Sequence, residues 1–162
     1  MKTSEELKED IINLVKLFED VKEYYIAKVN PASEAGVLGK YKAIVKGEFL
    51  IRKSGRVNLR FSVMRKTISD FQKIARDVAN VADLMLYIVE EGVMFSNKVG
   101  GIDEPFYNSL SSIYRKFLKY IVDWNLKDQF QVRCKELVKA SHDTGYGFGD
   151  ELCKLYDDNF PI

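Results

Sequence analysis

The sequence predicts an all-α protein that forms a single compact domain over residues 1–162. Apolar residues recur at spacings of three and four along most of the chain, which is the period of an amphipathic helix. Gly, Pro and Asn separate these apolar segments, and the separating stretches are short. About six or seven helices result. Short connections are typical of antiparallel neighbours, in either a bundle or a short stack of helix hairpins.

Length and composition also fit one folded domain. Of the 162 residues, 46% are hydrophobic and 30% are charged, as in ordinary globular proteins. The first residues are acidic and polar, without an apolar run behind a basic start, so we expect no targeting segment and a cytoplasmic location. Cys134 and Cys153 lie in amphipathic segments and form no CxxC pair, which suits reduced thiols in the core.

The most apolar segment, residues 78–95, is expected to be a central core helix. Apolar side chains cover most of its circumference, and a narrow polar stripe contains Asn80, Asp83, Tyr87 and Glu90. Three acidic residues within the segment make a membrane crossing a poor interpretation. A buried carboxylate needs a partner, so the partner of Asp83 is the main structural question.

The apolar pattern of the N-terminal half predicts three helices before this core helix. Residues 3–28 are expected to form one long amphipathic helix that begins with a Thr3–Glu6 capping box and ends at Asn30-Pro31. The next helix is expected to start near residue 32. The apolar face of the first helix is Leu7, Ile11, Leu14, Val15, Phe18, Val21, Tyr25 and Ile26. The apolar face of the second helix is Val37, Leu38, Tyr41, Ile44, Val45 and Phe49.

Glycines and caps set further expectations for this half. Gly36, Gly39 and Gly47 each weaken a helix by about 1 kcal/mol, so we expect a neighbouring helix to approach closely there. Residues 54–61 are expected to form a loop, although the alternation in RVNLRF also allows a short strand. Ser62 is then expected to cap a helix that runs to residue 76, and Asp77 to cap the core helix.

The C-terminal half predicts three more helices. A glycine pair at 100–101 ends the core helix, and Asp103-Glu104-Pro105 is a favourable helix start. That helix is expected to end near Trp124, and the next to occupy residues 126–141. A glycine-rich turn follows, with Tyr146 and Phe148 in the core, before a last short helix.

Positive charge is concentrated in one segment, although the net charge is only +1. Aromatic residues are interleaved with the basic ones, as a phosphate-backbone or acidic-partner surface requires. The alternative is that these residues are solvated helix faces, paired with acids that follow. The basic residues are Lys40, Lys42, Lys46, Arg52, Lys53, Arg56, Arg60, Arg65 and Lys66.

A second set of polar residues contains the candidates for a metal or acid–base site. The chain has one histidine and lacks both HExxH and the repeated Glu-x-x-His pairs of di-iron bundles. Helix-terminal roles explain most of these residues, so we expect no metal and no cofactor. The set is Asp83, Tyr87, Glu90, Asp103, Glu104, His142 and Asp150.

Two further motifs are weak indications of chemistry. Gly145, Gly147 and Gly149 resemble a phosphate-binding loop, but no strand precedes them and no Lys-Ser or Lys-Thr follows. A cysteine with His142 could act as a nucleophile, yet a thiol on an apolar helix face is normally inert. Neither motif predicts an enzyme.

Several longer motifs occur in a specific order: VKEYY, VNP, KYK, GEF, ISDF, ADLMLYIVEEGVMF, GGIDEPFYNSL, RCKELV and GYGFGDEL. Over residues 21–156 they resemble an uncharacterised bacterial family of small proteins, a domain of unknown function. The resemblance implies no established activity. The family pattern has Gly-Asp at Gly100-Gly101 and His at Gly149, so the absence of these polar residues here argues against an enzyme.

The leading hypothesis is therefore a non-enzymatic, cytoplasmic protein-interaction module. Its partner is expected to be a protein, including a second copy bound through an exposed aromatic face, and not a membrane. Tyr24, Tyr25, Tyr107 and Tyr114 would form such a face if they were exposed together. Nucleic-acid or polyanion binding through residues 40–66 is the first alternative, and a metal-dependent hydrolase is the second.

Overall fold

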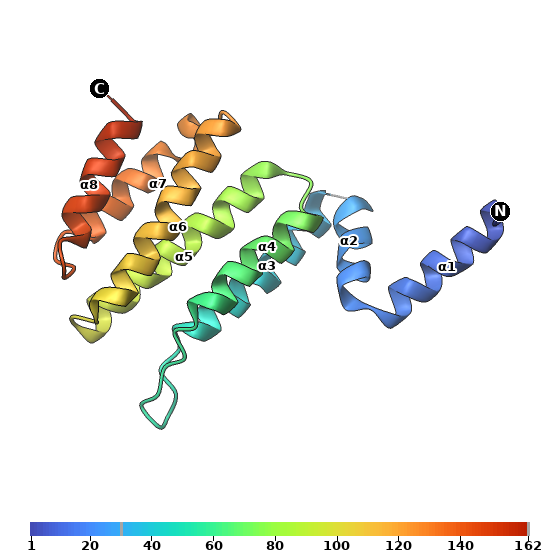
Figure 1. Cartoon of the computed structure of the whole chain (residues 1–162), viewed down its shortest axis with the longest axis horizontal. Coiled ribbons are helices and arrows are strands. Elements are labelled where there is room, and N and C mark those ends of the chain that lie inside the picture. The colour runs from blue at the N-terminus through green and yellow to red at the C-terminus, as the bar shows by residue number, and fades with distance from the viewer. Residues whose placement is uncertain (30, 162) are drawn as a thin grey trace.

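The computed structural model describes residues 1–29 and 31–161, and in this part of the chain all regular secondary structure is helical (Figure 1). No helix in these ranges has the combination of length and apolar character that a membrane crossing requires. Eight helices are present within the described residues. They are α1 (Ser4–Leu17), α2 (Glu19–Val29), α3 (Pro31–Glu48), α4 (Phe61–Ile74), α5 (Val78–Val99), α6 (Glu104–Asp123), α7 (Lys127–Ala140) and α8 (Phe148–Asn159).

The expected number of six or seven helices is slightly low because the first predicted helix is two helices. The Thr3–Glu6 capping box is confirmed, but the chain leaves helical geometry at Phe18, where φ is −125° and ψ is 116°. No Gly or Pro marks this break. It turns α2 so that Ala27 packs into the protein, whereas α1 projects away from it (Figure 1). The predicted helix end at Asn30 lies outside the described residues.

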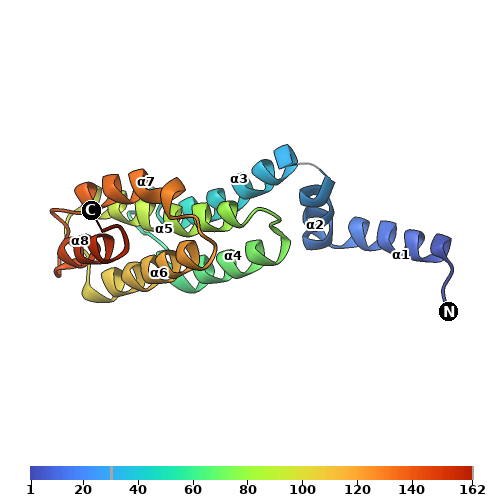
Figure 2. The ribbon, with the colours of Figure 1, turned by 90° about the horizontal axis from the view of Figure 1, so that it is seen from above.

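Helices α3 to α8 form two layers. One layer contains α3, α5 and α7, and the other contains α4, α6 and α8 (Figure 2). Consecutive helices pair as α3 with α4, α5 with α6, and α7 with α8, and each pair also contacts the next one. The hydrophobic core lies between the layers and is continuous from α3 to α8. At the N-terminal edge, α2 packs against α3 and α4, and α1 contacts α2.

The central position of α5 confirms the expected core helix. Asp77 caps it by accepting a hydrogen bond of 2.8 Å from the Ala79 N–H. It continues past residue 95 to Val99 and is followed by the C-cap Gly100, whose φ of +83° favours glycine. Gly92 lets α6 approach closely, because a Cβ built at this position would lie 2.5 Å from Leu110 Cδ2.

Two expectations for α3 and α4 are wrong. In the described structure, a Cβ at Gly36, Gly39 or Gly47 would meet no atom within 4 Å, so these glycines serve no close helix contact. Ser62 is not an N-cap, since α4 already begins at Phe61. The buried carboxylate of Glu48 instead fixes this helix start by accepting the Arg60 backbone N–H at 3.1 Å. The expected loop before α4 is confirmed.

The C-terminal helices follow the sequence closely. Asp103 caps α6 by accepting the Phe106 N–H at 3.2 Å, as expected. The last helix begins at Phe148, which is buried, whereas Tyr146 is 66% exposed and so is not in the core as expected. Gly149, the second residue of α8, packs closely against the chain after α7, because a Cβ there would lie 2.4 Å from the Ser141 carbonyl oxygen.

Candidate functional site

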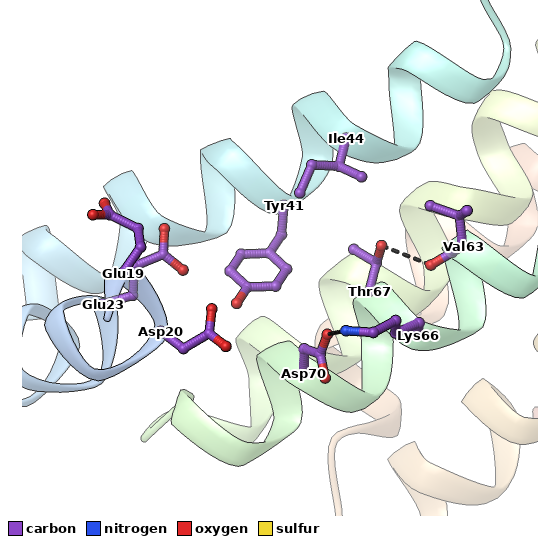
Figure 3. A pocket seen from close by; sticks show the side chains of 9 residues that line it. All are labelled: Glu19, Asp20, Glu23, Tyr41, Ile44, Val63, Lys66, Thr67 and Asp70. Atoms are coloured by element: carbon purple, nitrogen blue, oxygen red, sulfur yellow. Dashed lines mark hydrogen bonds and ion pairs between the residues drawn. The ribbon is translucent and has the colours of Figure 1, made fainter. Parts of the chain in front are cut away.

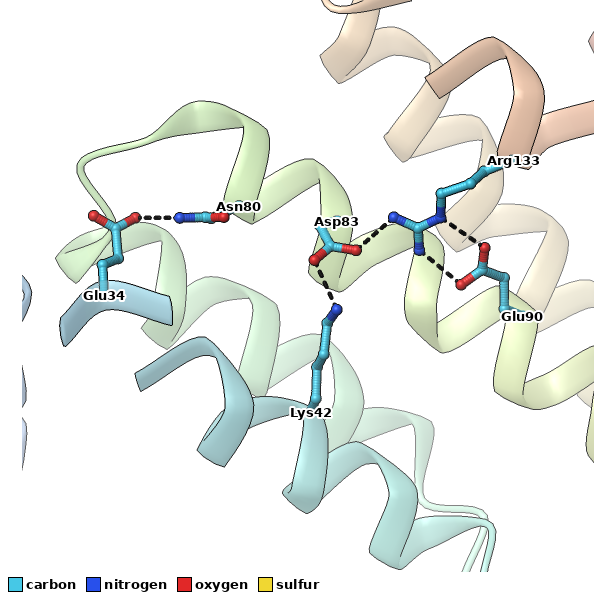
Figure 4. A network of polar contacts seen from close by, with 6 residues as sticks. All are labelled: Glu34, Lys42, Asn80, Asp83, Glu90 and Arg133. Atoms are coloured by element: carbon cyan, nitrogen blue, oxygen red, sulfur yellow. Dashed lines mark hydrogen bonds and ion pairs between the residues drawn. The ribbon is translucent and has the colours of Figure 1, made fainter. Parts of the chain in front are cut away.

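A network of charged side chains joins α3, α5 and α7 (Figure 4). Asp83 on α5 accepts hydrogen bonds from Lys42 Nζ at 2.7 Å and from Arg133 Nη1 at 2.6 Å. The same guanidinium donates to Glu90, from Nε to Oε1 at 3.0 Å and from Nη2 to Oε2 at 2.7 Å. Asp83 and Glu90 are seven residues apart, which places them on one face of α5, two turns from each other.

The charged groups of the network are paired with one another. Side-chain exposure is 21% for Asp83, 26% for Glu90 and 38% for Arg133, so water screens the group only in part. Burial by itself would lower the pKa of Arg133, but the hydrogen bonds to Glu90 and Asp83 raise it, and the guanidinium stays charged. Every charge in the network has an opposite partner, which makes it a clamp between three helices and leaves no free acid or base.

Tyr87 lies on the same edge of α5. The Lys42 Nζ is 5.0 Å from the centre of its ring, a distance typical of a cation–π contact. Burial raises the pKa of Tyr87, and the carboxylate of Glu91 raises it further, so the phenol stays neutral. The structure therefore brings together three of the four residues of the polar stripe on α5, Asp83, Tyr87 and Glu90, whereas Asn80 binds Glu34. Arg133 joins them, although no sequence pattern links it to α5.

The other four predicted polar residues lie at helix ends. Asp103 and Glu104 begin α6, and Asp150 is in the first turn of α8. His142 Nδ1 lies 3.0 Å from Asp143 Oδ1, and both side chains are almost fully exposed. The hydrogen bond to Asp143 raises the pKa of His142. Within the described ranges, no group of three or more His, Cys, Asp or Glu side chains converges to hold a metal ion.

A pocket of about 380 Å³ lies between α2, α3 and α4 (Figure 3). Tyr41 forms its centre, and burial raises the pKa of this tyrosine, with further contributions from Glu23 and Asp20. Ion pairs neutralise much of the acidic wall: Lys40 Nζ lies 3.3 Å from Glu23, and Lys66 pairs with Asp70. No sequence pattern indicates this pocket, because its acids come from separate helices.

The predicted basic surface is divided by such ion pairs. Lys40 and Lys66 pair with acids that line the pocket, Lys42 binds Asp83, and Arg60 Nη2 lies 2.7 Å from Glu48. The remaining five basic residues are exposed and lie on α3, the protruding loop of residues 50–60, and α4 (Figure 1). None of them forms an ion pair with another described residue. They are Lys46, Arg52, Lys53, Arg56 and Arg65.

The four selected tyrosines are not exposed together, and the two cysteines differ in burial. Tyr107 and Tyr114 are buried, so the four selected tyrosines cannot form one exposed face. Both cysteines are free thiols, as expected, but only Cys134 belongs to the core, and Cys153 is exposed. Burial raises the pKa of the Cys134 thiol to about 12, which makes it a poor nucleophile at neutral pH.

An uncovered apolar surface runs along α1. No residue of this helix is buried, although the sequence predicts a core-facing side. Leu7 is 51% exposed, Ile11 39%, Leu14 44% and Phe18, just beyond the helix, 54%. These four residues share one face of the helix, and we call them the α1 stripe. The sequence signal for it was present, but nothing local shows that the face stays exposed.

A second apolar surface is a groove of about 310 Å³ between α5 and α7. Val93 and Leu137 form its floor, and exposed Met94 and Val132 stand at its sides. Arg133 of the charge network lies at one edge. Glu90 and Arg133 of the charge network both line the groove, so the groove is continuous with the clamp.

These features define a small all-α protein with self-satisfied polar clusters and one unburied amphipathic helix. The chain belongs to a family of unknown function, DUF6155, whose sequence profile matches residues 2–159. This confirms the resemblance to a domain of unknown function, and the bacterial origin stays a prediction. Comparisons with curated proteins and with solved structures find no match.

Proposed function

We propose that this protein is a non-enzymatic interaction module, a single domain built as a short stack of helix hairpins that binds another protein through the α1 stripe. The exposure of this stripe is the observation that carries the proposal. Scattered apolar residues are normal on protein surfaces, but several on one face of one helix indicate a binding surface.

The position of α1 supports the proposal. In stacked helix pairs each unit contacts its neighbours and buries its apolar face against them. Here α1 contacts α2, but the residues of the α1 stripe stay exposed, so this apolar face is not covered by other described residues. An isolated helix of 14 residues is also marginal in water, so contact with a partner would stabilise it.

The state of the polar residues supports a role without catalysis. A general base or nucleophile needs a group whose pKa is tuned toward the working pH and that faces a cleft. Arg133 is held in the charged form, and burial keeps Tyr41 and Tyr87 neutral. Each of these shifts moves the group away from titration near neutral pH.

Photo-crosslinking tests this function. A benzophenone amino acid at Leu14 would lie in the stripe, and the same group at Asn13, also exposed, would point to another face of α1. We expect position 14 to give a discrete protein adduct in the native cells and position 13 to give none. Equal labelling from both positions, or no adduct from either, would contradict an interaction through the stripe.

Polyanion binding is a second candidate function, and the loop of residues 50–60 favours it. Arg52, Lys53 and Arg56 are exposed there. If all three contact phosphates of duplex DNA, the logarithm of the affinity should fall with the logarithm of salt concentration with a slope of about −2.7. Charge reversal of the three residues should abolish binding. A salt-independent affinity, or an unchanged affinity in the triple variant, would exclude this function.

A further inference from the structure

We infer that the α1 stripe binds the α1 stripe of a second copy of this chain, with the two helices antiparallel. This inference names the partner in the proposed function and rests on it. The stripe residues follow one another at intervals of four, three and four, which is the spacing of the seam between two helices of a coiled coil. Such a seam matches the width of one partner helix, and the further exposed apolar residues Ile12 and Leu17 lie on either side of it.

The residue order makes the stripe complementary to itself. When two antiparallel copies are centred between residues 12 and 13, Leu7 of one copy lies opposite Phe18 of the other. Ile11 then lies opposite Leu14, and the same two layers repeat on the other side of the two-fold axis. Every layer of the pair is apolar. Because each copy uses the same face, the contact closes as a dimer and leaves no open end.

Charge favours the antiparallel orientation. The N-terminal half of α1 carries four acidic residues against one lysine, Lys8, and Lys16 lies in the last turn. A parallel pair would bring the acidic halves of two copies together, whereas an antiparallel pair separates them and aligns opposite helix dipoles. The bend at Phe18 carries the acidic first turn of α2 out of line with α1 (Figures 1 and 2). The acidic residues of α1 are Glu5, Glu6, Glu9 and Asp10.

The same charge pattern disfavours other occupants of the stripe. Helices that lie on membranes carry Lys and Arg on the polar face, which attract anionic lipids. The polar face of α1 is predominantly acidic and would be repelled by such lipids. The helix is also short, about 21 Å long at 1.5 Å per residue. Each copy should therefore bury less surface in the dimer than the roughly 800 Å² per partner of a usual protein interface. We therefore expect a reversible, concentration-dependent dimer.

Sedimentation velocity of the full chain over a wide concentration range tests the self-association, with Ile11→Glu and Ile12→Glu as a matched pair. Both isoleucines are exposed, but Ile12 lies about 100° around the helix from Ile11 and outside the stripe. We expect the unaltered protein and Ile12→Glu to shift from monomer to dimer with concentration. Ile11→Glu should weaken the dimer at least tenfold. A monomer at all concentrations, or equal loss in both variants, would overturn the inference.

Disulfide trapping tests the orientation in a Cys153→Ser background, since Cys134 is buried. Leu7→Cys and Phe18→Cys proteins are oxidised separately and then as a mixture. The antiparallel dimer predicts a covalent dimer in the mixture and little in either protein alone. Efficient linking of each variant with itself would overturn the antiparallel arrangement. A monomeric protein that still gives a photo-adduct with a different protein at Leu14 would refute self-pairing and retain the proposed function.

Discussion

Buried carboxylates in this protein have specific structural partners. Glu34 on α3 accepts the backbone N–H groups of Arg76 and Asp77 at 3.2 and 3.1 Å, and the Asn80 side-chain amide at 2.9 Å. It therefore fixes the start of α5 from a neighbouring helix. Glu48 performs the same role for α4. Glu48 holds the start of a helix that has no side-chain cap of its own, whereas Glu34 supplements the cap that Asp77 already gives α5.

Glu48 should make stability depend on pH. Hydrogen bonds from Arg60 hold the pKa of its carboxyl below the usual value. This stabilisation is fully present above the unfolded pKa of about 4.3 and is lost as the pH falls through the lower folded value. We expect Glu48→Gln to reduce the free energy of unfolding by about 1–3 kcal/mol at pH 7 and by much less at pH 3, measured by urea titration. Glu136→Gln, in an exposed ion pair, is the control.

Arg133 is the residue whose loss should disturb the charge network most. Arg133→Met keeps much of the side-chain volume but leaves Glu90 without its bidentate partner. We expect a loss of about 1–3 kcal/mol in the free energy of unfolding, less than for a fully buried pair because water reaches the group. Lys119→Met breaks an exposed ion pair and should cost under about 1 kcal/mol. Equal losses would show that the network is no clamp.

At the scale of single helices, the sequence predicts starts and ends well where the cause is local. Thr3, Asp77 and Asp103 cap helices because their side chains reach backbone groups two or three residues ahead. The prediction fails where a distant residue decides. Glu48 sets the start of α4, and the break at Phe18 depends on packing of α2 against α3 and α4.

Two glycines in neighbouring helices should respond oppositely to the same change. Gly92→Ala would push a methyl group into Leu110, which is fully buried, and we expect a net loss of about 1–2 kcal/mol in the free energy of unfolding. Gly39→Ala meets open space in α3 and should add about 0.5–1 kcal/mol through helix propensity. Thermal and urea unfolding of the two variants measure both effects. Stabilisation by Gly92→Ala would show that α5 and α6 are not tightly packed there.

The candidate site was also predictable only where its features have a local cause. The polar stripe of α5 was visible in the sequence because Asp83 and Glu90 interrupt an apolar helix at a regular spacing. Their partner Arg133 is 43 residues from Glu90 in the chain. No periodicity relates the two. The exposure of the α1 stripe was equally hidden, since an amphipathic pattern shows which face is apolar and not what covers it.

For the molecule as a whole, α1 should be dispensable for folding. It buries none of its residues, whereas α2 places Ala27 in the interior. At a concentration where the protein is monomeric, we expect a variant that begins at Phe18 to melt within about 2 °C of the full chain. The reason is that alterations of exposed residues usually change the free energy of unfolding by less than about 0.5 kcal/mol. A variant that also lacks α2 should melt clearly lower. A large loss from removing α1 alone would show that it supports the fold.

The packing of each helix pair against its neighbours in the chain has a kinetic consequence. Contacts between segments that are close in sequence require only short loops to close before they form, and such topologies fold within microseconds to milliseconds. The body of this protein should therefore acquire its structure quickly as it is synthesised, pair by pair from the N-terminus. Assembly through α1, which requires an encounter between two chains, would be the slow step that follows.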